Sequence, residues 1–116
     1  MSIRVLVLAV AVCCAAPASA QEWRFCVGVA PAAHEAVITD IFSSAAESAR
    51  LEHRLENYFR VRHARALTFQ CPRGGSERVA AMNAQTAALQ FNRMLGFSVG
   101  GMTAAELSSA TGEAAY

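Results

Sequence analysis

Apolar and polar residues alternate from residue 23 to residue 29, which is the pattern of a β-strand with one buried face. Pro31 ends this run, and a second apolar run rich in β-branched residues spans 36–42. Because the connection between the two runs is short, we expect them to form an antiparallel hairpin. A third alternating run, 67–71, predicts a third strand, which ends at Pro72.

Between and after these runs, apolar residues recur at intervals of three and four, which predicts two helices. The first begins after Ser44, the first residue of a capping-box pattern, and ends near His63. The second begins after Ser76 and runs to Leu95, and Gly96 suits the position that follows a last helical turn. We expect the second helix to bury a stripe of small and aromatic residues, namely Ala80, Ala84, Ala87, Ala88, Phe91 and Leu95.

The C-terminal part of the chain predicts a short strand over 97–99 and a helix of about two turns, which Thr103 begins with a second capping-box pattern. The order β-β-α-β-α-(β) predicts an α+β fold, a small two-layer sandwich with the helices on one face of a three- to four-stranded sheet. We expect a single domain over 21–102, followed by the short helix and a frayed tail over 103–116.

The first twenty residues have a different pattern, which is typical of a secretory signal peptide. Arg4 precedes an apolar run over 5–16, and Ala18, Ser19 and Ala20 form a cleavage site that leaves Gln21 as the mature N-terminus. Since the apolar run is shorter than the roughly 20 residues that cross a bilayer, we expect no transmembrane segment after cleavage. The protein is therefore predicted to be periplasmic or secreted. Lipidation at Cys13 or Cys14 remains an alternative, although neither cysteine follows a small residue.

Two cysteines remain after cleavage, Cys26 and Cys71. In an exported protein such a pair predicts a disulfide bond. The two residues are 45 positions apart (71 minus 26), and closing that loop contributes about 4 kcal/mol of stability. The alternation places the two cysteines on different faces of their strands, so we expect the bond at a strand end.

The charge of the chain is nearly balanced, with 10 basic and 9 acidic residues, and loss of Arg4 leaves nine of each. This balance argues against nucleic acid as a partner. The densest basic cluster follows the end of the first predicted helix, where cations also favour the helix dipole. It is one candidate surface for an acidic protein or cell-envelope partner, and it comprises Arg60, Arg62, His63 and Arg65.

A polar stripe with a single charge follows one side of the second predicted helix. It is a second candidate binding surface, although a solvent-exposed face would have the same composition. The stripe comprises Asn83, Thr86, Gln90 and Arg93.

The sequence contains no recognisable catalytic motif and predicts no cofactor. His53 and His63 are ten residues apart on one helix, so they cannot share a metal ion, and we expect no metal site. The sequence favours a small disulfide-stabilised binding or accessory module of the cell envelope over an enzyme. The alternative is a small envelope enzyme or enzyme inhibitor with a site near His34, Glu35 and the loop 73–75, where Arg73 and two glycines could offer donors to an anion.

Overall fold

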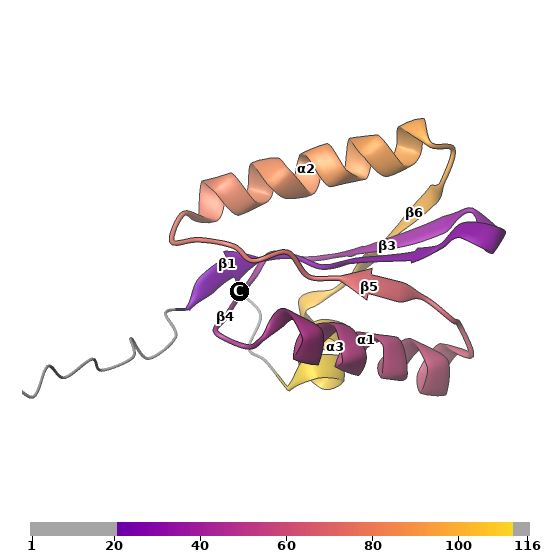
Figure 1. Cartoon of the computed structure of the whole chain (residues 1–116), viewed down its shortest axis with the longest axis horizontal. Helices are drawn as coiled ribbons and strands as arrows, with labels where there is room; N and C mark the ends of the chain where they lie inside the picture. Colours follow the sequence, from indigo (N-terminus) through magenta and orange to yellow (C-terminus); the bar gives the residue numbers. More distant parts are fainter. Residues whose placement is uncertain (1–20, 113–116) are drawn as a thin grey trace, which may run out of the picture.

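The computed structural model describes residues 21–112 and has a mixed α+β architecture, as predicted (Figure 1). The predicted signal peptide over 1–20 and the last residues of the predicted tail, 113–116, lie outside the described residues. The elements follow in the order β1 (Glu22–Arg24), β2 (Val27–Ala30), a 3-10 turn η1 (Pro31–Ala33), β3 (Glu35–Thr39), β4 (Phe42–Ser44), α1 (Ser48–His63), β5 (Thr68–Gln70), α2 (Arg78–Met94), β6 (Ser98–Met102) and α3 (Ala104–Thr111).

The main sheet has four strands in the order β5-β2-β3-β6. Strand β2 is antiparallel to β3 and to β5, which confirms the predicted hairpin. Strand β6 is parallel to β3 and longer than expected, since it continues through Gly100 and Gly101 to Met102. Strands β5 and β6 therefore form the two edges of the sheet.

Each of the first two predicted strands is divided into two, and the outer pieces β1 and β4 form a separate antiparallel ribbon. The division lies at Phe25 and Cys26. There the N–H of Cys26 donates to the side-chain oxygen of Thr39 at 2.9 Å, in place of a backbone carbonyl. A side-chain acceptor of this kind competes with the regular ladder, and the pairing breaks at that point.

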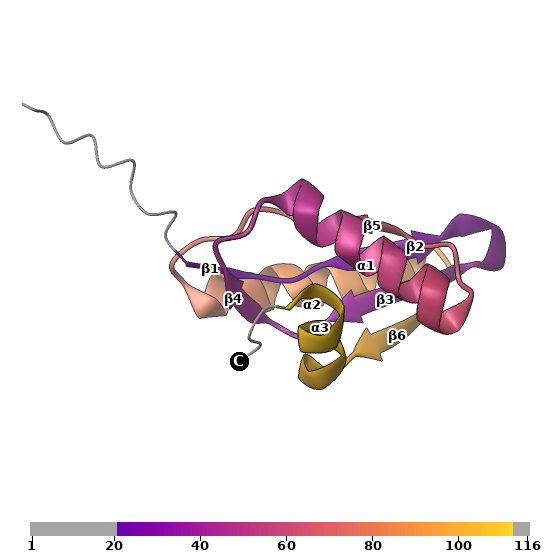
Figure 2. The same ribbon diagram turned by 90° about the horizontal axis from the view of Figure 1, so that it is seen from below.

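The helices cover both faces of the main sheet, and the predicted placement of all helices on one face is wrong. Helices α1 and α3 lie on one face, and α2 lies on the other (Figures 1 and 2). The reason is the order of the strands. The chain crosses from β3 to β5 through α1, and then returns across the sheet from β5 to β6 through α2. Crossovers between parallel strands are right-handed, so two crossovers in opposite directions place their helices on opposite faces.

Each face of the sheet has its own apolar core. Under α1 and α3 the core includes Phe42, Leu55, Phe69 and Leu107, and it is almost fully buried. Under α2 the core is smaller and consists of Phe25, Ile38, Ile41 and Ala81, with partly buried residues around it. The alternation of adjacent β3 residues, Val37 in the first core and Ile38 in the second, shows how one strand serves both.

The predicted buried stripe of α2 is wrong except at Ala88, which is partly buried against the second core. The helix lies over β1, β3 and β6, and the residues that it buries or half-buries are Ala81, Gln85, Ala88, Leu89 and Asn92. Phe91 and Leu95 are 61% and 55% exposed. Because the crossover carries α2 toward the β6 edge, the helix turns a different side to the sheet from the one that its apolar pattern predicts.

The helix ends agree with the sequence prediction better than the helix starts. Neither Ser44 nor Ser76 caps a helix: Ser44 belongs to β4, and α1 and α2 begin after Glu47 and Glu77, without a side-chain cap. At the end of α2, Gly96 has φ of +83°, which completes a reversal that favours glycine.

Helix α3 has the predicted cap, because the Thr103 hydroxyl accepts a hydrogen bond from Glu106 N at 3.2 Å. The helix continues past residue 109, where the sequence predicted fraying, and ends at Thr111. Leu107 belongs to the first core, Ala110 packs against it, and Thr111 is also buried. Tertiary packing thus supports a helix that is too short to be stable alone.

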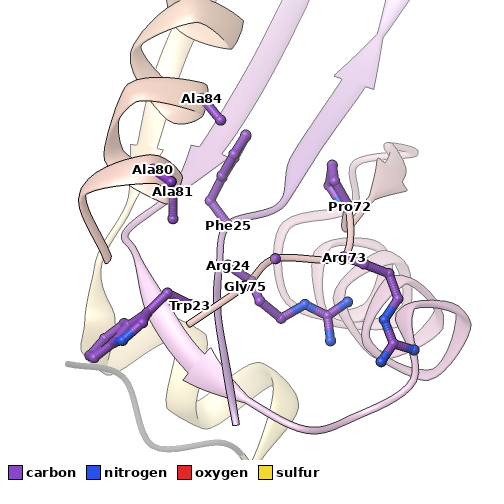
Figure 3. A pocket seen from close by; sticks show the side chains of 10 residues that line it. Trp23, Arg24, Phe25, Pro72, Arg73, Gly75, Ala80, Ala81 and Ala84 are labelled. Atoms are coloured by element: carbon purple, nitrogen blue, oxygen red, sulfur yellow. The ribbon is translucent and has the colours of Figure 1, made fainter. Parts of the chain in front are cut away.

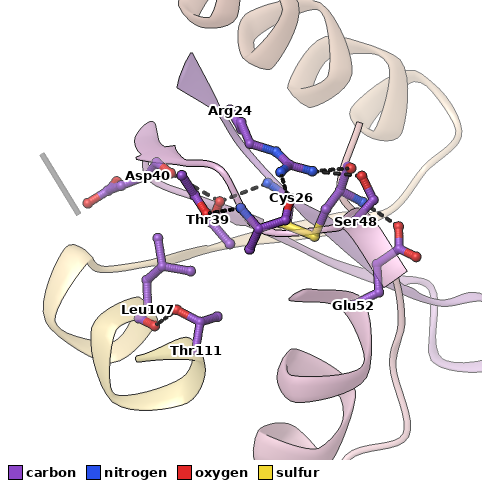
Figure 4. The surroundings of a disulfide bond; sticks show 11 residues. Arg24, Cys26, Thr39, Asp40, Ser48, Glu52, Leu107 and Thr111 are labelled. Carbon is purple, nitrogen blue, oxygen red and sulfur yellow. Dashed lines mark hydrogen bonds between the residues drawn. A yellow bond between two sulfur atoms is a disulfide. The ribbon is translucent and has the colours of Figure 1, made fainter. Parts of the chain in front are cut away.

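The predicted disulfide between Cys26 and Cys71 is present, with the two Cα atoms 4.2 Å apart (Figure 4). Cys26 lies in the break between β1 and β2, and Cys71 directly follows β5. The bond therefore lies at strand ends, as expected from the opposite faces that the alternation gave the two cysteines. It links the segment between β1 and β2 to the end of the edge strand β5.

Candidate functional site

The predicted basic cluster is at the end of α1, and three of its members, Arg60, His63 and Arg65, contact other residues of the molecule. Arg65 forms an ion pair with Glu35 at 2.6 Å, and its guanidinium lies 5.8 Å from the ring centre of Phe59. The ring of His63 also packs against Phe59. Arg60 and Arg62 are exposed, and Arg60 donates to a side chain of its own helix. These contacts are consistent with basic side chains that stabilise the C-terminal end of α1 through contacts inside the molecule.

The polar stripe of α2 is exposed at all four positions, namely Asn83, Thr86, Gln90 and Arg93. Thr86 and Arg93 line a cavity of about 290 Å³ between α2 and β6, together with Val99 and Gly100. This stripe therefore lies above one edge of the main sheet.

The residues of the alternative enzyme site are not brought together. His34 and Glu35 lie at the tip of the β2–β3 hairpin, and Gly75 pairs with Trp23 at the opposite end of the molecule (Figure 1). The eight residues from Trp23 to Ala30 alone span roughly 23 Å in extended form. Among residues 21–112, no group of three His, Cys, Asp or Glu side chains is placed to hold a metal ion.

The most distinctive surface feature is an apolar groove between α2 and the β2–β5 side of the sheet, which we name the α2 groove. It contains two hollows of about 280 and 400 Å³, which share Phe25 and Pro72 between them. The first hollow is shown in Figure 3. From α2 the groove is lined by seven residues, all apolar except Asn92, namely Ala80, Ala81, Ala84, Ala88, Phe91, Asn92 and Leu95.

All of these α2 residues except Ala81 and Asn92 are among the six that the sequence assigned to the core. The sheet side of the groove is mostly apolar, and includes the alternating row Trp23, Phe25, Val27 and Val29 together with Gln70 of β5. Both apolar patterns were visible in the sequence. That the two patterns face each other across an open groove could not be predicted from the sequence, since no local signal shows where the crossover places α2.

One end of the α2 groove is held by a network of ionic contacts around β1. Glu22 accepts from the Arg73 guanidinium at 3.1 Å and from Gly74 N at 3.1 Å. The hydrogen bond from Arg73 is the main cause that lowers the pKa of Glu22, and the same bond raises the pKa of Arg73. Glycine is required at position 74, because a Cβ there would lie 1.8 Å from the Trp23 carbonyl oxygen.

Beneath this end of the groove lies Arg24, which is only 1% exposed. Its guanidinium donates to Ser48 Oγ at 2.7 Å and to the Cys71 carbonyl at 3.1 Å, beside the disulfide (Figure 4). Burial lowers the pKa of Arg24. The side chain thus joins the start of α1 to the end of β5, and it fixes the strand that forms the groove floor.

The comparisons with known proteins leave the site to be interpreted from its own geometry. No protein-family model matches the chain, and no curated protein and no solved structure shows a significant similarity to it. In the described part of the chain, no helix has the length and apolar character needed to cross a membrane.

Proposed function

We propose that this protein is an exported, disulfide-stabilised binding module that holds an extended apolar segment of a partner protein in the α2 groove. The observation that carries the proposal is the exposure of the apolar stripe of α2, with Phe91 61% and Leu95 55% exposed. Soluble proteins rarely leave a contiguous apolar surface open, and such surfaces commonly bind partners.

The shape of the groove favours a polypeptide over a lipid chain. From Ala80 to Leu95 the helix rises roughly 22 Å, which matches about seven residues of an extended chain. The groove is divided into two hollows that meet at Phe25 and Pro72. Separate hollows suit individual side chains at intervals along a peptide, whereas an acyl chain fits one continuous tunnel.

The groove lining favours binding over catalysis. The titratable residues among those that line its two hollows are Arg24 and Arg73. Arg24 already donates hydrogen bonds to Ser48 at the start of α1 and to the Cys71 carbonyl. Arg73 already forms an ion pair with Glu22. A catalytic site needs convergent polar groups within reach of one reacting atom, and the apolar lining supplies hydrophobic contact instead.

The site of action that fits this module is the periplasm or the extracellular space. The signal-peptide pattern of residues 1–20 and the Cys26–Cys71 disulfide both support export to an oxidising compartment. A partner of the cell envelope is consistent with this location.

Selection of peptides from a displayed random heptapeptide library on the purified protein tests the proposal. We expect the selected peptides to share apolar residues at alternate positions. Phe91→Ser should weaken their binding by about tenfold or more, which corresponds to about 1.4 kcal/mol. The matched control is Val61→Ser, because Val61 is 70% exposed on α1, away from the groove.

Two results would contradict the proposal. One is equal loss of peptide binding in Phe91→Ser and Val61→Ser, which would indicate non-specific adhesion. The other is binding of a fluorescent fatty acid in the groove with no selected peptide, which would make the ligand a lipid.

A further inference from the structure

Strand β6 is an edge strand with one unpaired side in the part of the chain that the structure describes. The N–H of Ser98 and the C=O of Met102 both form hydrogen bonds on the β3 side, at 2.9 and 3.1 Å. Bonded positions alternate along a parallel ladder, so the backbone groups of Val99 and Gly101 are directed outward. They can pair with a further strand.

The composition of β6 is not explained by packing within the molecule. A Cβ at Gly101 would meet nothing within 4 Å, and one at Gly100 would meet only the Ala36 carbonyl, at 4.0 Å. Neither glycine has a positive φ. Glycine weakens a strand interior, and it often marks a place where another backbone approaches closely.

We propose that β6 pairs with β6 of a second copy of this chain, antiparallel and about a two-fold axis at Gly100, to form a homodimer with one continuous sheet. Val99 of each copy then forms the hydrogen-bonded pair with Gly101 of the other. Gly100 faces Gly100 of the second copy at the non-hydrogen-bonded position, where the two Cα atoms approach to about 4.5 Å. Gly100 has no side chain that could hinder this approach.

The polar stripe of α2 is self-complementary under the same symmetry. A two-fold axis makes the two α2 helices antiparallel on one face of the joined sheet. With the axis beside residue 88, Asn83 faces Arg93 of the second copy, and Thr86 faces Gln90. Thr86 and Arg93 line the cavity next to Val99 and Gly100, so the stripe lies over the edge that pairs. Neighbouring strands are about 4.8 Å apart. If α2 of each copy lies over its own β3–β6 pair, the axes of the two α2 helices are on the order of 10 Å apart, which is a normal packing distance for helices.

Charge complementarity favours a second copy over an unrelated peptide. Asp40 and Arg93 are both exposed and line the same cavity. Asp40 N bonds to Met102 O at the end of β6, whereas Arg93 is in the last turn of α2, near the start of β6. The two-fold axis therefore places Arg93 of each copy beside Asp40 of the other, and keeps the two arginines apart.

Sedimentation equilibrium of the purified protein tests the dimer. Gly101→Pro removes an N–H that faces outward and leaves the β3–β6 ladder intact, so we expect a monomer. Arg93→Glu should weaken dimerisation by at least about tenfold, and addition of Asp40→Arg should restore most of the loss. Arg50→Glu is the matched control, because it makes the same charge change at an exposed position of α1, and it should leave dimerisation unchanged.

Circular dichroism and thermal melting establish that each variant is folded. Because Arg93 is exposed, Arg93→Glu remains informative if Gly101→Pro does not fold. A wild-type protein that stays monomeric up to about 1 mM would overturn the proposal, as would a dimer that Gly101→Pro and Arg93→Glu leave intact. Neither result depends on the α2 groove, which lies on the other side of α2.

Discussion

Removal of the disulfide is the perturbation whose magnitude the structure defines best. In the double variant Cys26→Ala with Cys71→Ala, the unfolded chain regains the freedom that a crosslink over 45 positions removes. The chain-entropy relation gives about 4 kcal/mol for a loop of this length. A small domain has a total stability of about 5–15 kcal/mol, so this loss is a large fraction of it.

Urea denaturation followed by the fluorescence of Trp23, the one tryptophan of the chain, measures the free energy of unfolding. We expect the double variant to lose about 3–4 kcal/mol and to melt roughly 15–30 °C lower than the oxidised wild type. The control is the wild type under reducing conditions, which should agree with the double variant to within about 1 kcal/mol.

If the double variant loses less than about 1 kcal/mol of unfolding free energy relative to the oxidised wild type, this reasoning is refuted. It would mean that the contacts around Arg24, which joins Ser48 to the Cys71 carbonyl, already hold the two chain segments together without the covalent bond.

Three further predictions concern single contacts. Gly28→Ala should destabilise the fold by about 1–3 kcal/mol in urea denaturation, because the new Cβ would lie 2.5 Å from the ring of Phe69. Thr103→Ala should cost about 1 kcal/mol through loss of the α3 cap, whereas Thr103→Ser should cost little. The pKa of Glu22 is lowered from its ordinary value of 4.5 by the hydrogen bond from Arg73. The stabilising effect of this carboxylate is therefore present above pH 4.5 and is lost as the pH falls through its lowered pKa. The stability difference between wild type and Glu22→Gln, followed from pH 7 to pH 3, should shrink in that range; a constant difference would contradict the assignment.

Local patterns in the sequence were sufficient for most elements, because they depend on neighbouring residues. Alternation over 23–29 assigned Phe25 and Cys26 to opposite faces, and they do belong to the two different cores. Gly96 marked the end of α2 because its positive φ is a local requirement. The pairing of Cys26 with Cys71 followed from counting alone.

Helix starts were predicted less well, because capping boxes compete with strand pairing. Ser44 has the sequence pattern of a cap, yet it pairs with Glu22 in the β1–β4 ribbon. Its hydroxyl accepts from Ala46 N, so the side chain makes a local turn and not a helix cap. Only the tertiary pairing decides between these uses of one serine.

The sequence by itself determined that α2 is amphipathic, that residues 23–29 carry an apolar row, and that the two cysteines can be joined. It did not determine which apolar surfaces meet. The strand order β5-β2-β3-β6 places α2 on the face opposite α1 and carries it toward β6. As a result Phe91 and Leu95 line an open groove, although their spacing is that of core residues. Hydrophobic periodicity records that a side chain is apolar and on one face, whereas its burial depends on contacts between elements distant in the chain, which only the tertiary structure fixes.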